Sequence, residues 1–165
     1  WLNGQYIRST SFEKFSNDAL SQIGKDLNRE LFNEETERLN IILPSVQERI
    51  ETMNDLYDQV SFLLDEPFLV NDQEWESVNS IEAQKYLNII RNKFIELDEF
   101  NLENIESLMR NVLEEEEIKT KVGFQSTRVA ITGTKISPPL FESIFALGKE
   151  TSIARLTESI EKLTN

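Results

Sequence analysis

The 165-residue sequence contains no cysteine and no histidine. Without cysteine the chain has no disulfide, no thiolate nucleophile and no cysteine-based zinc site, and without histidine it lacks the commonest general base and metal ligand. The carboxylates do not compensate, because no pair has a spacing that singles it out and the calcium-binding loop with a central glycine is absent. We therefore expect no catalytic residue and no metal site in this chain.

Long apolar runs are also missing. No stretch of about 18 uninterrupted apolar residues could span a bilayer, and no basic segment followed by an apolar one precedes the first polar residues. We expect a soluble, globular, cytoplasmic protein with no membrane partner, and an apolar content of 39% is enough for a buried core. The sequence begins at Trp1 rather than at methionine, so we also expect it to be a fragment of a longer protein.

Basic residues are scarce and unevenly placed. The net charge is −13, which disfavours a polyanionic partner at first sight. Residues 1–117 carry 10 basic and 26 acidic groups (−16), whereas residues 118–165 carry 7 and 4 (+3), and the two parts sum to −13. Because surface charges are screened beyond about 8 Å at physiological salt, a distant acidic surface does not forbid a local basic site. We expect an anionic ligand to prefer the C-terminal part.

Apolar residues recur three and four positions apart along most of the chain, which predicts an all-α fold. Helix starts are marked by residues that cap helices well, such as Ser80 and Asn101. The apolar stripes that follow these two caps begin with Ile81 and Leu102, and we expect both stripes to face the core.

The stretch from Pro67 to Ser80 is polar and has no helical repeat, so it is the best candidate for a domain boundary. We place the junction near Val70 and expect two small helical subdomains in tandem, residues 1–70 and residues 71–165. The acidic residues Asp72, Glu74 and Glu76 within this stretch are interpreted as solvated loop residues rather than metal ligands.

The C-terminal part contains a locally basic segment. We expect a loop around Gly123, a short apolar piece from Val129 to Ile131, and a turn at Gly133. The triplet Ser137-Pro138-Pro139 then opens a helix, because serine is a preferred N-cap and proline suits the first turn. A basic loop before a helix N-terminus favours an anion. The alternative is a capped helix with a polar loop that binds nothing.

A longer C-terminal pattern is made up of Arg128 to Gly133, Pro138, Leu140 to Glu142, Leu147 to Glu150 and Arg155-Leu156. It resembles the C-terminal signature of bacterial-type glutamyl-tRNA synthetases, which are class I aminoacyl-tRNA synthetases. The opening Trp1 to Arg8, aromatic-rich around the turn dipeptide Asn3-Gly4, resembles the segment after that family's catalytic and stem-contacting domains.

The resemblance implies the anticodon-binding region of such a ligase, built as an α-helical cage. The family's two ATP-site signatures, His-Ile-Gly-His and Lys-Met-Ser-Lys-Ser, are absent from this sequence. The resemblance therefore places the active site, with its ATP and Mg, in an N-terminal part of a monomeric parent enzyme, and implies no cofactor in this fragment. The implied partner is the tRNA for glutamate.

By this resemblance, the residues that face the anticodon are Arg49, Arg128, Ser137, Pro138, Pro139 and Leu140. The family often has threonine and glycine at the positions of Ser137 and Pro139. Proline there removes an N–H that glycine would offer to RNA. Such contacts suit an anticodon, because unpaired bases are read through hydrogen bonds to their Watson–Crick edges.

Arg49 stands at the discriminating position by the same resemblance. Glutamate anticodons end in cytosine, whose edge offers two acceptors, whereas glutamine anticodons end in guanine, whose edge offers two N–H donors. A guanidinium carries only donors, so it favours cytosine and opposes guanine. The alternative is an exposed helical arginine paired with Glu48 or with the neighbours of Met53.

Two other functional classes stay open at this point. The first is an acidic, all-helical protein–protein interaction module whose basic C-terminal loop is incidental. The second is an independent enzyme, which the absence of histidine and cysteine disfavours.

Overall fold

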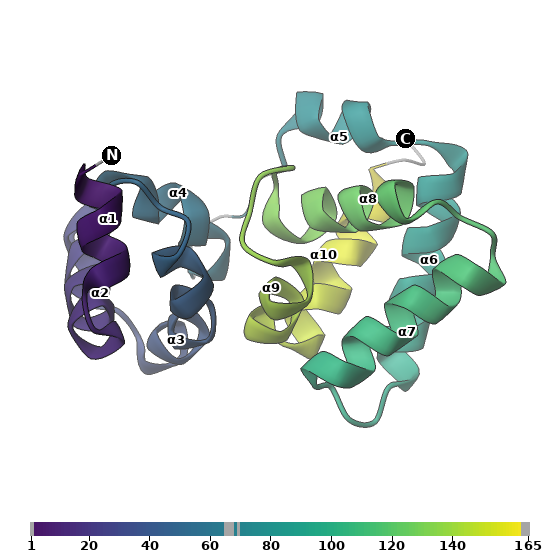
Figure 1. Ribbon diagram of the computed structural model, residues 1–165. Helices are drawn as coiled ribbons and strands as arrows, with labels where there is room; N and C mark the ends of the chain where they lie inside the picture. Colours follow the sequence, from purple (N-terminus) through teal and green to yellow (C-terminus); the bar gives the residue numbers. More distant parts are fainter. Residues whose placement is uncertain (1, 65–67, 69, 163–165) are drawn as a thin grey trace. The chain divides into compact units, whose positions relative to one another are not determined.

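The computed structural model describes residues 2–64, 68 and 70–162, and every regular element in this part of the chain is helical (Figure 1). The predicted all-α fold class is therefore confirmed. The chain separates into two compact units, Trp1–Pro67 and Phe68–Asn165. This division lies close to the junction predicted near Val70, and separate functional roles for the two units stay a prediction. Trp1 and Pro67 themselves lie outside the described residues.

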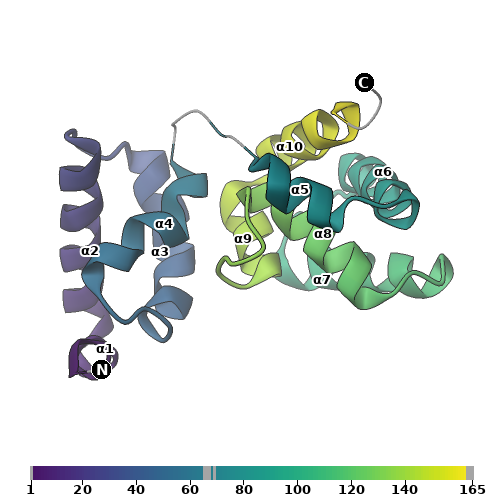
Figure 2. The ribbon, with the colours of Figure 1, turned by 90° about the horizontal axis from the view of Figure 1, so that it is seen from above.

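The first unit contains α1 (Leu2–Ser9), α2 (Phe12–Leu27), α3 (Asn33–Gln47) and α4 (Leu56–Val60), with 3-10 turns at Met53–Asp55 and Ser61–Leu63. Helices α2, α3 and α4 pack against one another, and Figure 2 shows them side by side. Their apolar stripes meet in a core whose large, fully buried side chains are Ile23, Leu39, Ile42, Leu43, Leu56 and Leu63. The predicted turn at Asn3-Gly4 is wrong, because both residues lie inside α1.

Two buried polar side chains fix the ends of these helices. Glu35 is fully buried, and its carboxylate accepts two hydrogen bonds from Arg29, at 2.7 and 2.8 Å, and one from the Phe32 N–H at 2.9 Å. The Gln47 amide donates to the carbonyls of Ile7 and Thr10, at 2.9 and 2.8 Å. Gln47 thereby ties the end of α3 to the end of α1.

The second unit contains α5 (Asp72–Val78), α6 (Ile81–Glu96), α7 (Leu102–Glu115), α8 (Thr120–Thr132), α9 (Leu140–Leu147) and α10 (Lys149–Glu161). Helix α8 is central, because it contacts α5, α6, α7, α9 and α10 (Figure 1). Buried residues on α8 accordingly lie on more than one side of the helix; they include Ser126, Thr127, Val129, Ala130 and Ile131.

The predicted caps of α6 and α7 are confirmed. The Ser80 hydroxyl accepts from the Ala83 N–H at 3.1 Å, and the Asn101 side chain accepts from the Asn104 N–H at 2.9 Å. The expected burial of the first apolar residue of each helix is wrong, since Ile81 is 85% exposed and Leu102 is 40% exposed. Side chains at a first helical position lean toward the N-terminus and project past the end of the helix.

The boundary stretch contains a helix that the sequence pattern did not predict. Helix α5 is capped by Asn71, whose side chain accepts from the Glu74 N–H at 3.1 Å. Its single buried residue is Trp75, so the sequence has no repeating apolar stripe that would predict this helix. Consequently Asp72, Glu74 and Glu76 are helical residues and not loop residues.

Helix α8 also corrects the prediction of a loop around Gly123. Gly123 lies inside the helix, and its lack of a Cβ lets α8 approach its neighbours closely. A Cβ at this position would come 2.5 Å from Leu113 Cδ2 and 3.0 Å from Tyr86 Cε1. The Tyr86 hydroxyl, behind it, donates to the Met109 carbonyl at 2.9 Å. Burial raises the pKa of Tyr86, with a smaller opposing effect from Arg110, so this phenol stays neutral.

A buried arginine joins α10 to the end of α8. Arg155 is 7% exposed, its Nη1 donates to the Ile131 carbonyl at 2.6 Å, and its guanidinium carbon lies 3.7 Å from the centre of the Phe68 ring. A carbonyl in the last turn of a helix has no intrahelical partner, so this hydrogen bond satisfies a group that burial would otherwise leave unpaired.

Arg155→Ala should therefore destabilise the second unit. Loss of a buried, charge-assisted hydrogen bond and of the packing on Phe68 should lower the free energy of unfolding by about 2 to 4 kcal/mol. Urea unfolding followed by circular dichroism measures it. The matched control is Lys162→Ala, a cation exposed to solvent just after α10, which should change stability by less than about 0.5 kcal/mol. Equal stabilities of the two variants would contradict this role.

Candidate functional site

The basic segment singled out in the sequence begins on the last turns of α8 and continues as a loop into α9. Arg128 lies on α8, and Gly133 follows the helix with φ of 81°. A positive φ at this position favours glycine, which has no Cβ to oppose it. The chain can therefore turn away from α8 directly after Thr132.

Arg128 holds this loop in place. Its Nη1 donates to the Ser137 hydroxyl and to the Pro138 carbonyl, each at 2.6 Å, and lies 3.3 Å from the Ser137 carbonyl. The structure thus brings together three of the residues predicted to face the anticodon. In this conformation the Arg128 guanidinium is hydrogen-bonded to the loop, and it therefore stabilises the conformation of the loop.

The loop is further braced by its own hydroxyl groups. The Thr134 hydroxyl donates to the Ile136 carbonyl at 2.6 Å and accepts from the Ile136 N–H at 2.9 Å. The Thr132 hydroxyl donates to the carbonyls of Arg128 and Thr134, at 2.8 and 3.1 Å. These bonds fix the backbone around Ile136, whose side chain is 78% exposed.

Helix α9 begins later than predicted, at Leu140, with Pro139 as its N-cap and not Ser137. The Ser137 hydroxyl instead accepts a hydrogen bond from Arg128. The first backbone hydrogen bond of the helix runs from the Ser143 N–H to the Pro139 carbonyl at 3.0 Å. Leu140 is only 4% exposed and anchors the start of α9 in the core. A contact between RNA and Leu140, Pro138 or Pro139 stays a prediction.

The positive charge of the loop is partly neutralised. Lys135, 38% exposed, pairs with Glu74 of α5 at 3.5 Å. The helix α5 that the sequence did not predict therefore supplies a carboxylate next to the basic segment. The net positive charge of this segment is therefore smaller than its composition indicates.

Arg49 belongs to the first unit and lies in the turn after α3, not on the helix. Its N–H donates to the Val46 carbonyl at 2.9 Å, and the buried Gln47 just before it anchors the end of α3. The side chain is exposed, and no ion pair with Glu48 or with the residues around Met53 is found among the described residues. The alternative of a paired helical arginine is therefore not supported.

One cluster beside the basic segment was missed in the sequence. The guanidinium carbon of Arg110 on α7 lies 5.5 Å from the ring centre of Phe124 and 5.4 Å from that of Phe141. The two rings meet edge to face, with their centres 5.3 Å apart. The only local signal was Glu106, four residues before Arg110, which gives a helical ion pair of an ordinary kind.

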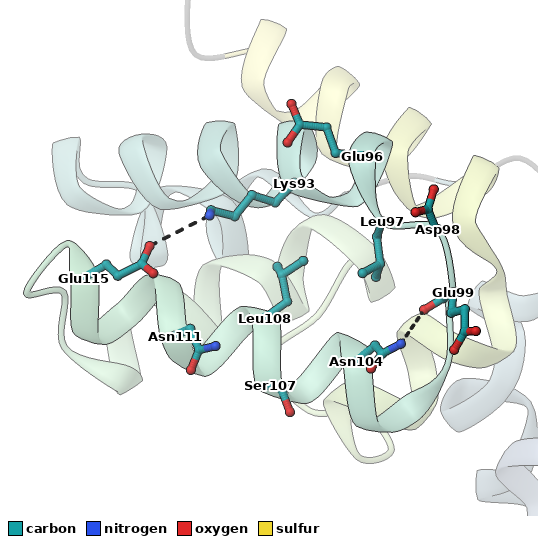
Figure 3. Close-up of a pocket in the computed structure, with 10 residues that line it drawn as sticks. All are labelled: Lys93, Glu96, Leu97, Asp98, Glu99, Asn104, Ser107, Leu108, Asn111 and Glu115. Carbon is teal, nitrogen blue, oxygen red and sulfur yellow. Dashed lines mark hydrogen bonds and ion pairs between the residues drawn. The ribbon is translucent and has the colours of Figure 1, made fainter.

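A groove between the end of α6 and α7 does not suit a polyanion. It has a volume of about 630 Å³, and its walls carry the carboxylates of Glu96, Asp98, Glu99 and Glu115 with a single cation, Lys93 (Figure 3). Lys93 is itself directed at Glu115, 3.8 Å away. No group of carboxylates that could hold a metal ion is found in the described part of the chain, and the expected absence of metal and cofactor stays a prediction. None of the described helices is long and apolar enough to cross a membrane.

The described residues form two all-helical units, and the second carries a braced loop between α8 and α9. Comparison with known families then identifies the chain: a family model described as an anticodon binding domain matches residues 11–160, and the chain belongs to this family.

The relatives are glutamate–tRNA ligases, which confirms the resemblance predicted from the sequence. The chain is 34% identical to the glutamate–tRNA ligase of Cutibacterium acnes, over 94% of this chain and 33% of that protein. It is 31% identical to the enzyme of Clostridium botulinum, over 99% of this chain and 33% of that protein. The chain thus spans about a third of the length of these relatives.

A solved structure shares the fold. The crystal structure of a glutamate tRNA ligase from Elizabethkingia meningosepticum matches with a TM-score of 0.82 at 23% identity, over 99% of this chain and 32% of that chain. With these matches, the alternative of an acidic protein-interaction module is not favoured.

Removing the Arg128 guanidinium should loosen the loop without unfolding the protein. In Arg128→Gln, loss of the short bonds to Ser137 and Pro138 should speed exchange of the Ile136 amide hydrogen about tenfold or more, since hydrogen bonds to charged groups are worth about 1.5 to 3 kcal/mol. Hydrogen exchange followed by NMR measures this. Lys135→Gln, in the same loop, should change that rate much less, because the lysine is exposed and its ion pair with Glu74 is long, at 3.5 Å. Similar rates in both variants would rule out Arg128 as the brace.

Proposed function

We propose that this chain reads the anticodon of a glutamate tRNA, as part of a longer, cytoplasmic and monomeric glutamate–tRNA ligase. The observation that carries the proposal is the match of residues 11–160 to an anticodon binding domain. The ATP-dependent attachment of glutamate, with its Mg, belongs to a catalytic part outside this chain. Within the chain, the residues proposed to face the anticodon are Arg49, Arg128, Ser137, Pro138, Pro139 and Leu140.

The braced loop supports a reading role because base recognition needs donors and acceptors in fixed positions. An RNA loop presents unpaired bases whose edges can be hydrogen-bonded by protein groups. Arg128 donates to the Ser137 hydroxyl and to the Pro138 carbonyl, each at 2.6 Å, so little ordering of this loop remains to be done when RNA binds. In this proposal Arg128 positions the loop, and the exposed surface of the loop faces the anticodon.

The geometry of Arg49 supports a second contact. Its backbone is held by the Val46 carbonyl, while its guanidinium is exposed. A guanidinium offers two parallel donors, which match the two acceptors of the cytosine edge and oppose the donors of guanine. A good bidentate contact of this kind is worth roughly 1 to 3 kcal/mol of discrimination.

Footprinting tests the proposal directly. Full-length protein carrying this chain should protect the anticodon loop of glutamate tRNA from chemical cleavage, and the double reversal Arg128→Glu with Lys135→Glu should remove that protection. The control reverses two exposed, ion-paired cations of α6, Lys85→Glu with Lys93→Glu, and should keep it. An anticodon left unprotected by the unmodified protein would overturn the proposed function.

Selectivity tests the role of Arg49. Aminoacylation kinetics of Arg49→Gln in the full-length protein should show a loss of about tenfold or more in the preference for glutamate tRNA over glutamine tRNA. Glutamine carries both a donor and an acceptor, so it no longer opposes guanine. Lys25→Gln, an exposed cation at the end of α2, removes the same charge from the same unit and should leave the ratio unchanged. Unchanged selectivity in Arg49→Gln would refute the assignment.

A further inference from the structure

Arg110 is held over two aromatic rings from two different helices. Its guanidinium carbon lies 5.5 Å from the centre of Phe124 on α8 and 5.4 Å from the centre of Phe141 on α9. Both rings are half-buried, whereas the Arg110 side chain is 51% exposed. The rings therefore support a cation that faces solvent.

The charge of Arg110 is already paired within α7. Its Nε and Nη2 both donate to the Glu106 carboxylate, at 2.8 and 2.7 Å. A phosphate at this position would meet the Glu106 carboxylate as well as the guanidinium. Arg110 is thus a poor anchor for a phosphate, but its planar, delocalised group is fixed in orientation by the carboxylate and by the rings.

The cluster borders the segment proposed to read RNA. Phe124 lies four residues before Arg128 on α8, which places both on the same face of that helix. Phe141 directly follows Leu140 at the start of α9. The two rings therefore lie within one helical turn of Arg128 on α8 and at the first turn of α9, adjoining the proposed site.

We propose that Arg110, supported by Phe124 and Phe141, is a stacking platform for an unpaired base next to those that are read. Unpaired RNA bases stack on aromatic rings and on guanidinium planes, and such contacts tolerate any base because each has a π-face. The platform holds the neighbouring nucleotide and so orients the bases read by the loop. This inference rests on the proposed anticodon-reading function.

Binding of fluorescently labelled glutamate tRNA to the full-length protein, measured by anisotropy over a range of salt concentrations, tests the platform. Arg110→Lys and Arg110→Ala should each weaken binding about fivefold to tenfold, because neither keeps a planar group over the rings. The slope of log K against log salt should stay the same, since no phosphate contact is lost. Lys93→Gln, an ion-paired cation of the acidic groove, should leave affinity unchanged.

A double-mutant cycle locates the base. Abasic sites placed one at a time in the anticodon loop should include one position that weakens binding by the unmodified protein but has little further effect on Arg110→Lys. Wild-type affinity in Arg110→Lys or Arg110→Ala, a salt slope reduced by about one, or fully additive effects at every position would overturn the platform. Failure of the unmodified protein to bind this tRNA is a different result, because it removes the proposed function itself.

Discussion

Backbone carbonyls at element ends are bound by basic side chains throughout the second unit, and the arrangement of its helices depends on these bonds. Lys149 donates to the carbonyls of Ile95 and Leu97, at 3.0 and 2.8 Å, and so fastens the end of α6 to α10. Arg155 donates to the Ile131 carbonyl at the end of α8, and Arg128 donates to the Pro138 carbonyl before α9. The carbonyls of Ile95, Leu97 and Ile131 lie at helix C-termini, where they lack intrahelical partners and carry a partial negative charge, so a cation satisfies both needs at once. The Pro138 carbonyl lies in the loop before α9. Arg128, Lys149 and Arg155 all belong to the C-terminal pattern that pointed to the family, which therefore reflects architecture as well as binding.

This use of basic residues changes the meaning of the local charge. Residues 118–165 carry 7 basic and 4 acidic groups, which suggests a surface attractive to RNA. Three of those cations are bound to carbonyls, and Lys135 is paired with Glu74 at 3.5 Å. The attraction of the C-terminal part for a polyanion is consequently weaker than its composition indicates, because affinity for nucleic acid depends on cations free to displace counterions from phosphates.

Features decided by neighbouring residues could be predicted from the sequence, and features decided by distant ones could not. The caps at Ser80 and Asn101 bond to N–H groups three residues away, and both predictions are confirmed. The predicted loop at Gly123 is wrong because this glycine makes room for Leu113 and Tyr86, which pack against α8. Local sequence patterns do not reveal such a contact between distant residues. The start of α9 was misplaced for a similar reason: Ser137, a good N-cap by type, bonds instead to Arg128. The roles of the six predicted site residues stay predictions, although three of them meet at one place.

An acidic binding domain with few free cations is suited to selectivity more than to affinity. The net charge of −13 repels every tRNA to a similar extent, since all of them carry the same kind of phosphate backbone. A penalty shared by two ligands cancels in the ratio of their affinities, which is what determines specificity. Contacts with base edges, such as those proposed for Arg49 and the Arg128 loop, differ between tRNAs and do not cancel. The shared repulsion therefore lowers affinity for every tRNA and leaves the ratio unchanged, so any discrimination comes from the contacts with base edges. The acidic composition that first argued against nucleic acid is then compatible with reading it.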